Sequence, residues 1–155
     1  MLSRRSSGVT LLELIIVITV ILILMAAAVP VVRLSVKRAR ETELRRDLWE
    51  MRNAIDRYKD YSDRGMLRTE VGSEGYPPDL DTLVKGVALG GGGANGKNVR
   101  FLRRVPVDPM TGQADWGMRS IQDDPDSQSW GGKNVFDVYS KSQGTALDGT
   151  KYSDW

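Results

Sequence analysis

The feature that most constrains this chain is a nearly uninterrupted apolar run close to its beginning. Residues 9–29, 21 positions in all, contain only Thr10, Glu13 and Thr19 as non-apolar residues. A helix of about 20 residues spans the roughly 30 Å hydrocarbon core of a bilayer. A helix that is apolar on every side must be surrounded by lipid or by other apolar helices. The run therefore predicts a helix that crosses a membrane or packs inside an assembly.

Three interpretations of this run are open. The first is a secretory signal peptide, with Arg4 and Arg5 as its charged start and alanines 26–28 as a cleavage site. The second is a plain membrane anchor, and the third is a pilin-like helix that leaves the membrane when a filament assembles. Glu13 favours the third, because a carboxylate in an apolar run is costly unless it is paired.

Composition narrows the chemistry available to the rest of the chain. The 155 residues include no histidine and no cysteine, and their net charge is +2. This excludes a Ser-His-Asp triad, thiol catalysis, imidazole zinc sites and disulfides. A bound metal would need oxygen ligands, as calcium and magnesium do. The small net charge gives no argument for nucleic acid, and no pair of carboxylates indicates a catalytic cleft, so we predict a protein that is not an enzyme.

A helical pattern continues beyond the apolar run. One stripe of apolar residues recurs at spacings of four, three, four and three, which is the period of an α-helix. The stripe consists of Leu44, Leu48, Met51, Ile55 and Tyr58. We therefore predict an amphipathic helix over 30–62, either continuous with 9–29 or separated from it at Pro30.

Residues 63–155 have the pattern of a small, loop-rich head. A short helix is expected to begin at Pro77 and Pro78, with Leu80, Leu83 and Val84 on its inner face. Two short strands joined by a turn over 108–112, and a third strand over 134–140, predict an antiparallel sheet. Residues 91–97 have the glycine and lysine spacing of a phosphate-binding loop, but Asn98 follows where Ser or Thr is needed, so we interpret them as a plain loop.

The N-terminal residues carry a family resemblance. Ser7-Gly8 followed by VTLLELIIVITVILILMAAAVP resembles the start of type IV pilins and of the pseudopilins of type II secretion. The resemblance implies that residues 1–8 are a leader removed by a prepilin peptidase, that Val9 is then N-methylated, and that Glu13 pairs with the N-terminal amine of a neighbouring subunit. Pro30 matches the position where the family's helix kinks or loosens, whereas Val9 departs from the usual phenylalanine.

The head resembles one branch of that family. The runs YPPDLDTLV, FLRRVPVDPMTG with Trp116 after it, and FDVYSKSQGTALDGTKYSDW resemble the major, G-type pseudopilin. That branch commonly has a calcium site in its C-terminal loop. The oxygen donors that this chain offers for such a site are Asp148, Ser140, Ser142 and Asp154. Gln143 and Lys151 stand where the family often has acids, so a loop held by hydrogen bonds and by Trp155 is the alternative.

Together these observations predict an α+β, type IV pilin-like fold, with a long N-terminal helix packed on a small antiparallel sheet. The resemblance implies a single-pass protein of the bacterial inner membrane, with its head in the periplasm, that polymerises into the pseudopilus of type II secretion. Its implied partners are copies of itself, minor pseudopilins, the prepilin peptidase and methyltransferase, and an inner-membrane platform protein. The alternatives are the major pilin of a type IV pilus and a secreted binding protein that loses its first 28 residues.

The charges around the apolar run do not agree with that orientation. The short leader has two arginines, whereas four basic residues follow the run, at Arg33, Lys37, Arg38 and Arg40. Counting basic residues near the ends of a span would place the C-terminal side in the cytoplasm. We give the motif more weight, because its elements are more specific than a loop-charge count.

Overall fold

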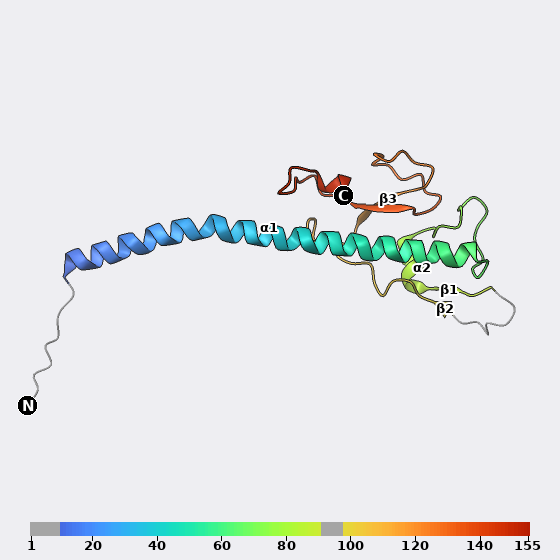
Figure 1. The fold of residues 1–155 in the computed structure, drawn as a ribbon, viewed down its shortest axis with the longest axis horizontal. Helices are drawn as coiled ribbons and strands as arrows, with labels where there is room; N and C mark the ends of the chain where they lie inside the picture. The colour runs from blue at the N-terminus through green and yellow to red at the C-terminus, as the bar shows by residue number, and fades with distance from the viewer. Residues whose placement is uncertain (1–9, 91–97) are drawn as a thin grey trace, which may run out of the picture. The chain divides into compact units, whose positions relative to one another are not determined.

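The structure is a computed structural model that describes residues 10–90 and 98–155. Gly8 and Val9, and the glycine-rich loop 91–97, lie outside the described residues, and at 27–30 only the helical backbone is described. The chain divides into two compact units, 1–38 and 39–155, which are described separately. The predicted α+β architecture is confirmed: one long helix is followed by a short helix and small antiparallel sheets (Figure 1).

Helix α1 runs from Leu11 to Asp63 as one element, so of the two possibilities left open at Pro30 the structure has the continuous helix. The side chain of Thr10 begins the helix by accepting a hydrogen bond from the backbone amide of Glu13, with 3.2 Å between the two atoms. A threonine followed three residues later by a glutamate is a helix-starting pair, because the threonine oxygen satisfies an amide that has no partner in the first turn.

Within the first unit, α1 presents its apolar side chains on every side. All 13 large apolar residues from Leu11 to Met25 are exposed, with 48–79% of their surface accessible. This stretch is long and apolar enough to cross a membrane, and none of it is buried in the structure. The observation agrees with the prediction of a helix that is apolar all round.

Within the second unit, the other half of α1 carries the core of the head. The predicted stripe is confirmed, since Leu44, Leu48, Met51, Ile55 and Tyr58 are all at most 3% exposed. Buried residues from later in the chain pack on this stripe; they include Leu83, Phe101, Trp116, Val135, Val138 and Tyr152. The helix therefore acts as the wall on which the head assembles.

Helix α2, Leu80–Lys85, begins later than the sequence predicts. Asp79, and not a proline, is its N-cap: the Asp79 carboxylate accepts hydrogen bonds from the backbone amide of Thr82 at 2.6 Å and from its hydroxyl at 2.7 Å. These bonds satisfy amide groups that the first turn leaves free. Leu80 and Leu83 are buried against the core, as expected.

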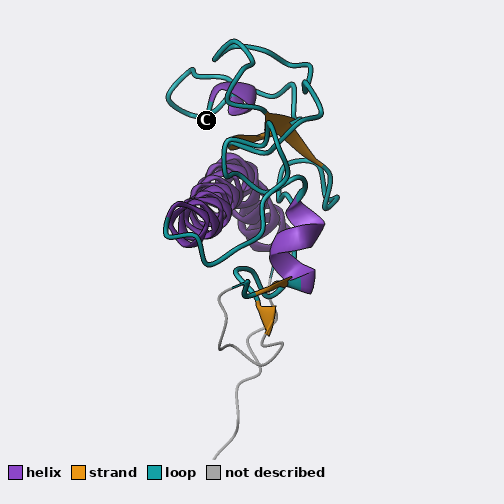
Figure 2. Cartoon of the chain, turned by 90° about the vertical axis from the view of Figure 1, so that its right-hand side faces the viewer, coloured by secondary structure: helices purple, strands orange, loops and turns teal. Residues whose placement is uncertain are grey.

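The strands form two separate ribbons. Strand β1, Val87–Ala88, pairs with β2, Asn98–Val99, and β3, Trp116–Arg119, pairs with β4, Asp137–Ser140, both antiparallel. Figures 1 and 2 show the two ribbons on opposite sides of α1. The predicted strand before the 108–112 turn does not form, because the amides of Phe101 and Leu102 both donate to the carbonyl of Leu83, each at 3.0 Å.

One close approach sets the geometry of the β3–β4 ribbon. Gly117 lies directly opposite Tyr139, and the tyrosine ring occupies the space where a side chain at position 117 would stand. A Cβ atom built on Gly117 would lie 2.2–2.5 Å from three atoms of that ring. Two other contacts hold the Tyr139 ring in this position. The Arg119 guanidinium stacks on the ring at 4.1 Å, and the Tyr139 hydroxyl donates to the Gln128 carbonyl at 3.0 Å.

We therefore predict that Gly117→Ala lowers the free energy of unfolding by about 1–3 kcal/mol, the usual cost of overpacking a filled site. Urea unfolding of the full chain in detergent, followed by circular dichroism, measures this. Gly90→Ala is the matched control, because the nearest atom to its added Cβ is on the Arg68 side chain, at 3.2 Å, and that side chain is free to move aside. Equal stability of the two variants would contradict the packing.

Candidate functional site

The first candidate site is the start of α1. Glu13 is the acidic residue of the first helical turn, where a negative charge is favoured by the partial positive charge of the helix N-terminus. The residues around it on the helix are apolar and exposed. Thr19, the other polar side chain within the helical run, donates its hydroxyl hydrogen to the carbonyl of Ile15 at 2.7 Å. Thr19 is thus satisfied within its own helix, whereas Glu13 has a carboxylate to pair elsewhere.

The second candidate site is segment 141–155, for which the sequence left open a calcium site, with Ser140 as a further donor, or a loop held by hydrogen bonds and Trp155. In the structure this segment lies along α1. Glu41 of the helix receives two hydrogen bonds from this segment on one carboxylate oxygen, from the Leu147 amide and from the Tyr152 hydroxyl, both at 2.9 Å. Burial, and then the hydrogen bond to Glu41, raise the pKa of Tyr152 to about 12. The hydroxyl therefore stays protonated, and remains a donor to Glu41, throughout the physiological range.

Arg45, one helical turn further on, makes a second set of contacts with the same segment. Its guanidinium lies 3.7 Å from the centre of the Trp155 ring and 3.3 Å from the carboxylate of Asp148. The Trp155 ring nitrogen donates to the hydroxyl of Thr150 at 2.6 Å. Arg45 thus supplies a positive charge both to an aromatic face and to the central carboxylate of the segment.

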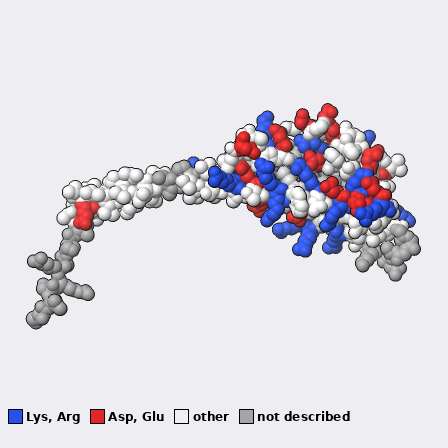
Figure 3. Space-filling model, in the orientation of Figure 1, with Lys and Arg blue, Asp and Glu red and all other residues white. Residues whose placement is uncertain are grey.

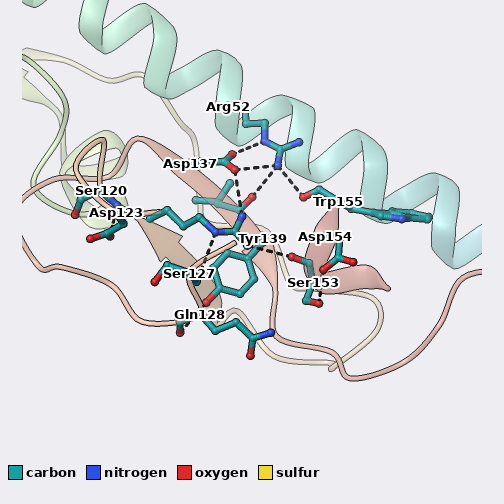
Figure 4. Close-up of polar contacts among 12 residues, drawn as sticks. Arg52, Ser120, Asp123, Ser127, Gln128, Asp137, Tyr139, Ser153, Asp154 and Trp155 are labelled. Atoms are coloured by element: carbon teal, nitrogen blue, oxygen red, sulfur yellow. Dashed lines mark hydrogen bonds and ion pairs between the residues drawn. The ribbon is translucent and has the colours of Figure 1, made fainter. Parts of the chain in front are cut away.

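Arg52 ties the helix to β4 and to Trp155 (Figure 4). Its guanidinium donates to Asp137 at 2.6 Å, to the carbonyl of Val138 at 3.1 Å and to the main-chain oxygen of Trp155 at 2.8 Å. Arg119 approaches the same Asp137 at 3.5 Å from β3. A planar guanidinium suits this task, because its donors point in several directions at once.

The predicted metal donors are engaged with protein partners. One oxygen of Asp148 accepts from the amide and the hydroxyl of Thr150, and the other faces Arg45. The bonds from Thr150, with the nearby charge of Arg45, lower the pKa of Asp148. The hydroxyl of Ser140 is buried and donates to Asp108 at 2.6 Å.

The remaining two donors also have local partners. The hydroxyl of Ser142 accepts from the amide of Gly144 at 3.3 Å. One carboxylate oxygen of Asp154 accepts from the hydroxyl of Ser153 at 3.0 Å.

This donor set does not fit a calcium ion. Calcium takes six to eight oxygen ligands, several of them carboxylates. Within residues 10–90 and 98–155, no group of three or more acidic side chains is placed to hold a metal. The groove beside Asp148 and Asp154 is also lined by Arg45 and Arg52, whose charges oppose a bound cation.

The residues that hold segment 141–155 were not predicted from the sequence. Glu41, Arg45 and Arg52 are spaced four and seven residues apart, which places them on one side of a helix. That spacing was the available sequence signal for a charged row on the helix, and these residues lie beside the apolar stripe. Their partners are 85 to 111 residues away along the chain, and nothing in the local pattern indicates them.

Comparison with known proteins bears on the first site. Residues 3–29 match the family model described as the prokaryotic N-terminal methylation motif. The match includes Gly8, Val9 and Glu13, and it supports the type IV pilin-like resemblance drawn from these residues. No curated protein and no solved structure matches the chain.

We predict that segment 141–155 is insensitive to calcium. Neither calcium chloride nor a chelator should change the melting temperature of the full chain in detergent, because side chains of α1 already hold the segment. Arg45→Ala should lower that temperature by about 2–5 °C. Arg45→Lys is the matched control, since lysine keeps the charge but loses the planar stacking on Trp155. A rise in melting temperature on adding calcium would contradict this account of the segment.

Proposed function

We propose that this protein is a structural subunit of the helical pseudopilus filament of type II secretion. The observation that carries the proposal is the start of α1, where a processing motif is followed by an exposed apolar helix with one carboxylate, Glu13, in its first turn. The 13 large apolar residues from Leu11 to Met25 are 48–79% exposed, so burying them contributes roughly half of the 1.5–3 kcal/mol that a fully exposed side chain would, on the order of 10–20 kcal/mol in all. Lipid covers these apolar side chains before assembly, and neighbouring helices cover them afterwards.

In this proposal residues 1–8 are a leader, 9–29 cross the inner membrane and later form the filament core, and 30–62 continue the helix into a periplasmic head at 63–155. A prepilin peptidase cuts between Gly8 and Val9, and Val9 is then methylated. Minor pseudopilins and an inner-membrane platform protein assist assembly. The choice of a secretion pseudopilus, and not a type IV pilus, rests on the resemblance of the head's sequence runs to the G-type branch.

Glu13 is proposed to select the register of assembly. An unpaired carboxylate in hydrocarbon is unfavourable, and the amine on a neighbour's Val9 relieves that cost when the two helices are correctly staggered. Apolar packing alone is not directional, so it would tolerate several staggers. The charge pair adds the specificity that packing lacks.

Mass spectrometry of the mature protein from the membrane and filament fractions tests this function. We expect a chain that begins at Val9 and carries a methyl group on its N-terminus. A chain that begins at Val29 would identify a secreted protein with a removed signal peptide. An uncut chain in the assembled fraction would also overturn the proposed processing.

We predict that Glu13→Ala and Glu13→Gln reach the membrane but reduce the sheared filament fraction by on the order of 10- to 100-fold, because each removes one partner of a buried ion pair. Thr19→Ala, which removes a polar group from the same run without changing its charge, should assemble normally. The measurement is an immunoblot of membrane and sheared fractions from the same cells. Filaments of normal abundance from both Glu13 variants would rule out the assembly role.

A further inference from the structure

The head has a groove lined by arginines, two of which form no ion pair with another described residue of the same copy. It is a cavity of about 390 Å³ between the 50–57 stretch of α1 and the segment that follows β2. Arg57, Arg100 and Arg103 line it, and Glu50 is the acidic residue of its described wall. The wall therefore has an excess of two positive charges.

The groove is held rigidly in its present form. Arg57 donates to the carbonyl of Phe101 at 2.7 Å, and its guanidinium lies 5.9 Å from the centre of that ring. The Phe101 ring is packed edge-on against Tyr58 and Tyr61, at 5.4 and 5.3 Å. Of the three groove arginines, Arg57 is fixed in this way, and it loses little conformational freedom when a partner binds.

The groove arginines are available for such a partner. Arg100 and Arg103 are exposed, and neither forms an ion pair with another of the described residues. Most other basic side chains of the head have an acid or a carbonyl beside them, as Arg45, Arg52 and Arg119 do. Among the described residues of the head, Arg68, Arg104, Lys133 and Lys151 also form no ion pair, but Arg100 and Arg103 are the two of this group that line a groove together.

A complementary surface is present in the loop after β3. Asp124 and Asp126, on either side of Pro125, are exposed and form no ion pair within the part of the chain that the structure describes. Lys133, in the same loop, offsets one of the two charges. The loop is therefore weakly acidic overall, with its two carboxylates close together at one turn.

Interactions on both sides fix the shape of this acidic turn. Asp123 accepts from the amides of Ser120 and Gly131 at 2.7 and 3.0 Å, and these bonds lower its pKa. Arg119 donates to the carbonyl of Ser127 at 2.8 Å. Asp123 therefore bonds within the loop, whereas Asp124 and Asp126 are exposed to solvent.

The two surfaces cannot meet in one copy. In Figure 1 the segment after β2 lies below α1 and the loop after β3 lies above it. Figure 3 shows basic side chains along the lower edge of the head, whereas acidic and basic side chains are mixed along its upper edge. Two different, complementary patches on one molecule join copies head to tail, and repetition of such a contact builds an open polymer.

We propose that the arginine groove binds the Asp124–Asp126 turn of a second copy of this chain. The proposal deepens the proposed filament and rests on it. Each groove receives a carboxylate turn and each turn enters a groove, so every subunit in the interior of the polymer makes the contact twice. The charges also steer copies into this orientation and oppose one in which two grooves face each other.

Charge reversal in the full chain, co-produced with its assembly system, tests the contact. We expect Arg100→Glu with Arg103→Glu, and separately Asp124→Arg with Asp126→Arg, each to reduce the sheared filament fraction at least about tenfold, since close charge pairs at an interface couple strongly. The chain that carries all four reversals should assemble again. The two defective chains should also assemble when they are produced together, because each groove then finds an oppositely charged turn.

Matched controls make the same charge changes away from the contact. Arg64→Glu and Asp81→Arg alter exposed residues whose ion pairs lie within four residues, with Asp60 and Lys85, and should leave filaments unchanged. Melting temperatures of all variants in detergent exclude misfolding. Normal filaments from either reversed pair would overturn the contact. A fourfold variant that does not recover would also overturn it, and would indicate that the groove binds an unrelated acidic partner. Absence of filaments from the unaltered chain would instead count against the proposed function.

Discussion

The head of this protein depends on one face of a single helix. Within the described residues it has two sheets of two strands each, and an isolated two-stranded ribbon is at best marginally stable in water. The stripe from Leu44 to Tyr58 provides the apolar surface that these ribbons lack. Fully burying a side chain of this kind contributes about 1.5–3 kcal/mol, so the five-residue stripe is worth on the order of 10 kcal/mol. Without it the ribbons and loops would have little to pack on.

The polar flank of the same helix has a second role. Glu41, Arg45 and Arg52 hold segment 141–155 and β4 to the helix through hydrogen bonds, an ion pair and an aromatic contact. These side chains hold the C-terminal segment in place from the helix side. Under the proposed function, the C-terminal loop of each head is therefore fastened to the same helix that polymerises.

Local patterns were predicted well where a residue's role depends on its near neighbours. The stripe could be read from the helical period, and the N-terminal methylation motif from Ser7-Gly8 and the apolar run with Glu13 that follows. The strand expected before the 108–112 turn was wrong, because the Leu83 carbonyl captures the amides of Phe101 and Leu102. The start of α2 was placed too early, at Pro77 and Pro78. The helix begins after Asp79, because the Asp79 carboxylate accepts a hydrogen bond from the Thr82 amide and so caps the first turn.

The sequence by itself determined the N-terminal motif, the apolar run and the buried face of α1, because each is a property of residues only a few positions apart. The tertiary structure alone decided which charges pair across long stretches of the chain, whereas pairs four residues apart, such as Arg64 with Asp60, follow from helical spacing. Arg52 meets Asp137, 85 residues away, whereas Arg100 and Arg103 meet no acid among the described residues. The physical reason is that ion pairing depends on distance in space. For residues far apart in the sequence, their spacing along the chain says nothing about that distance until the chain has folded.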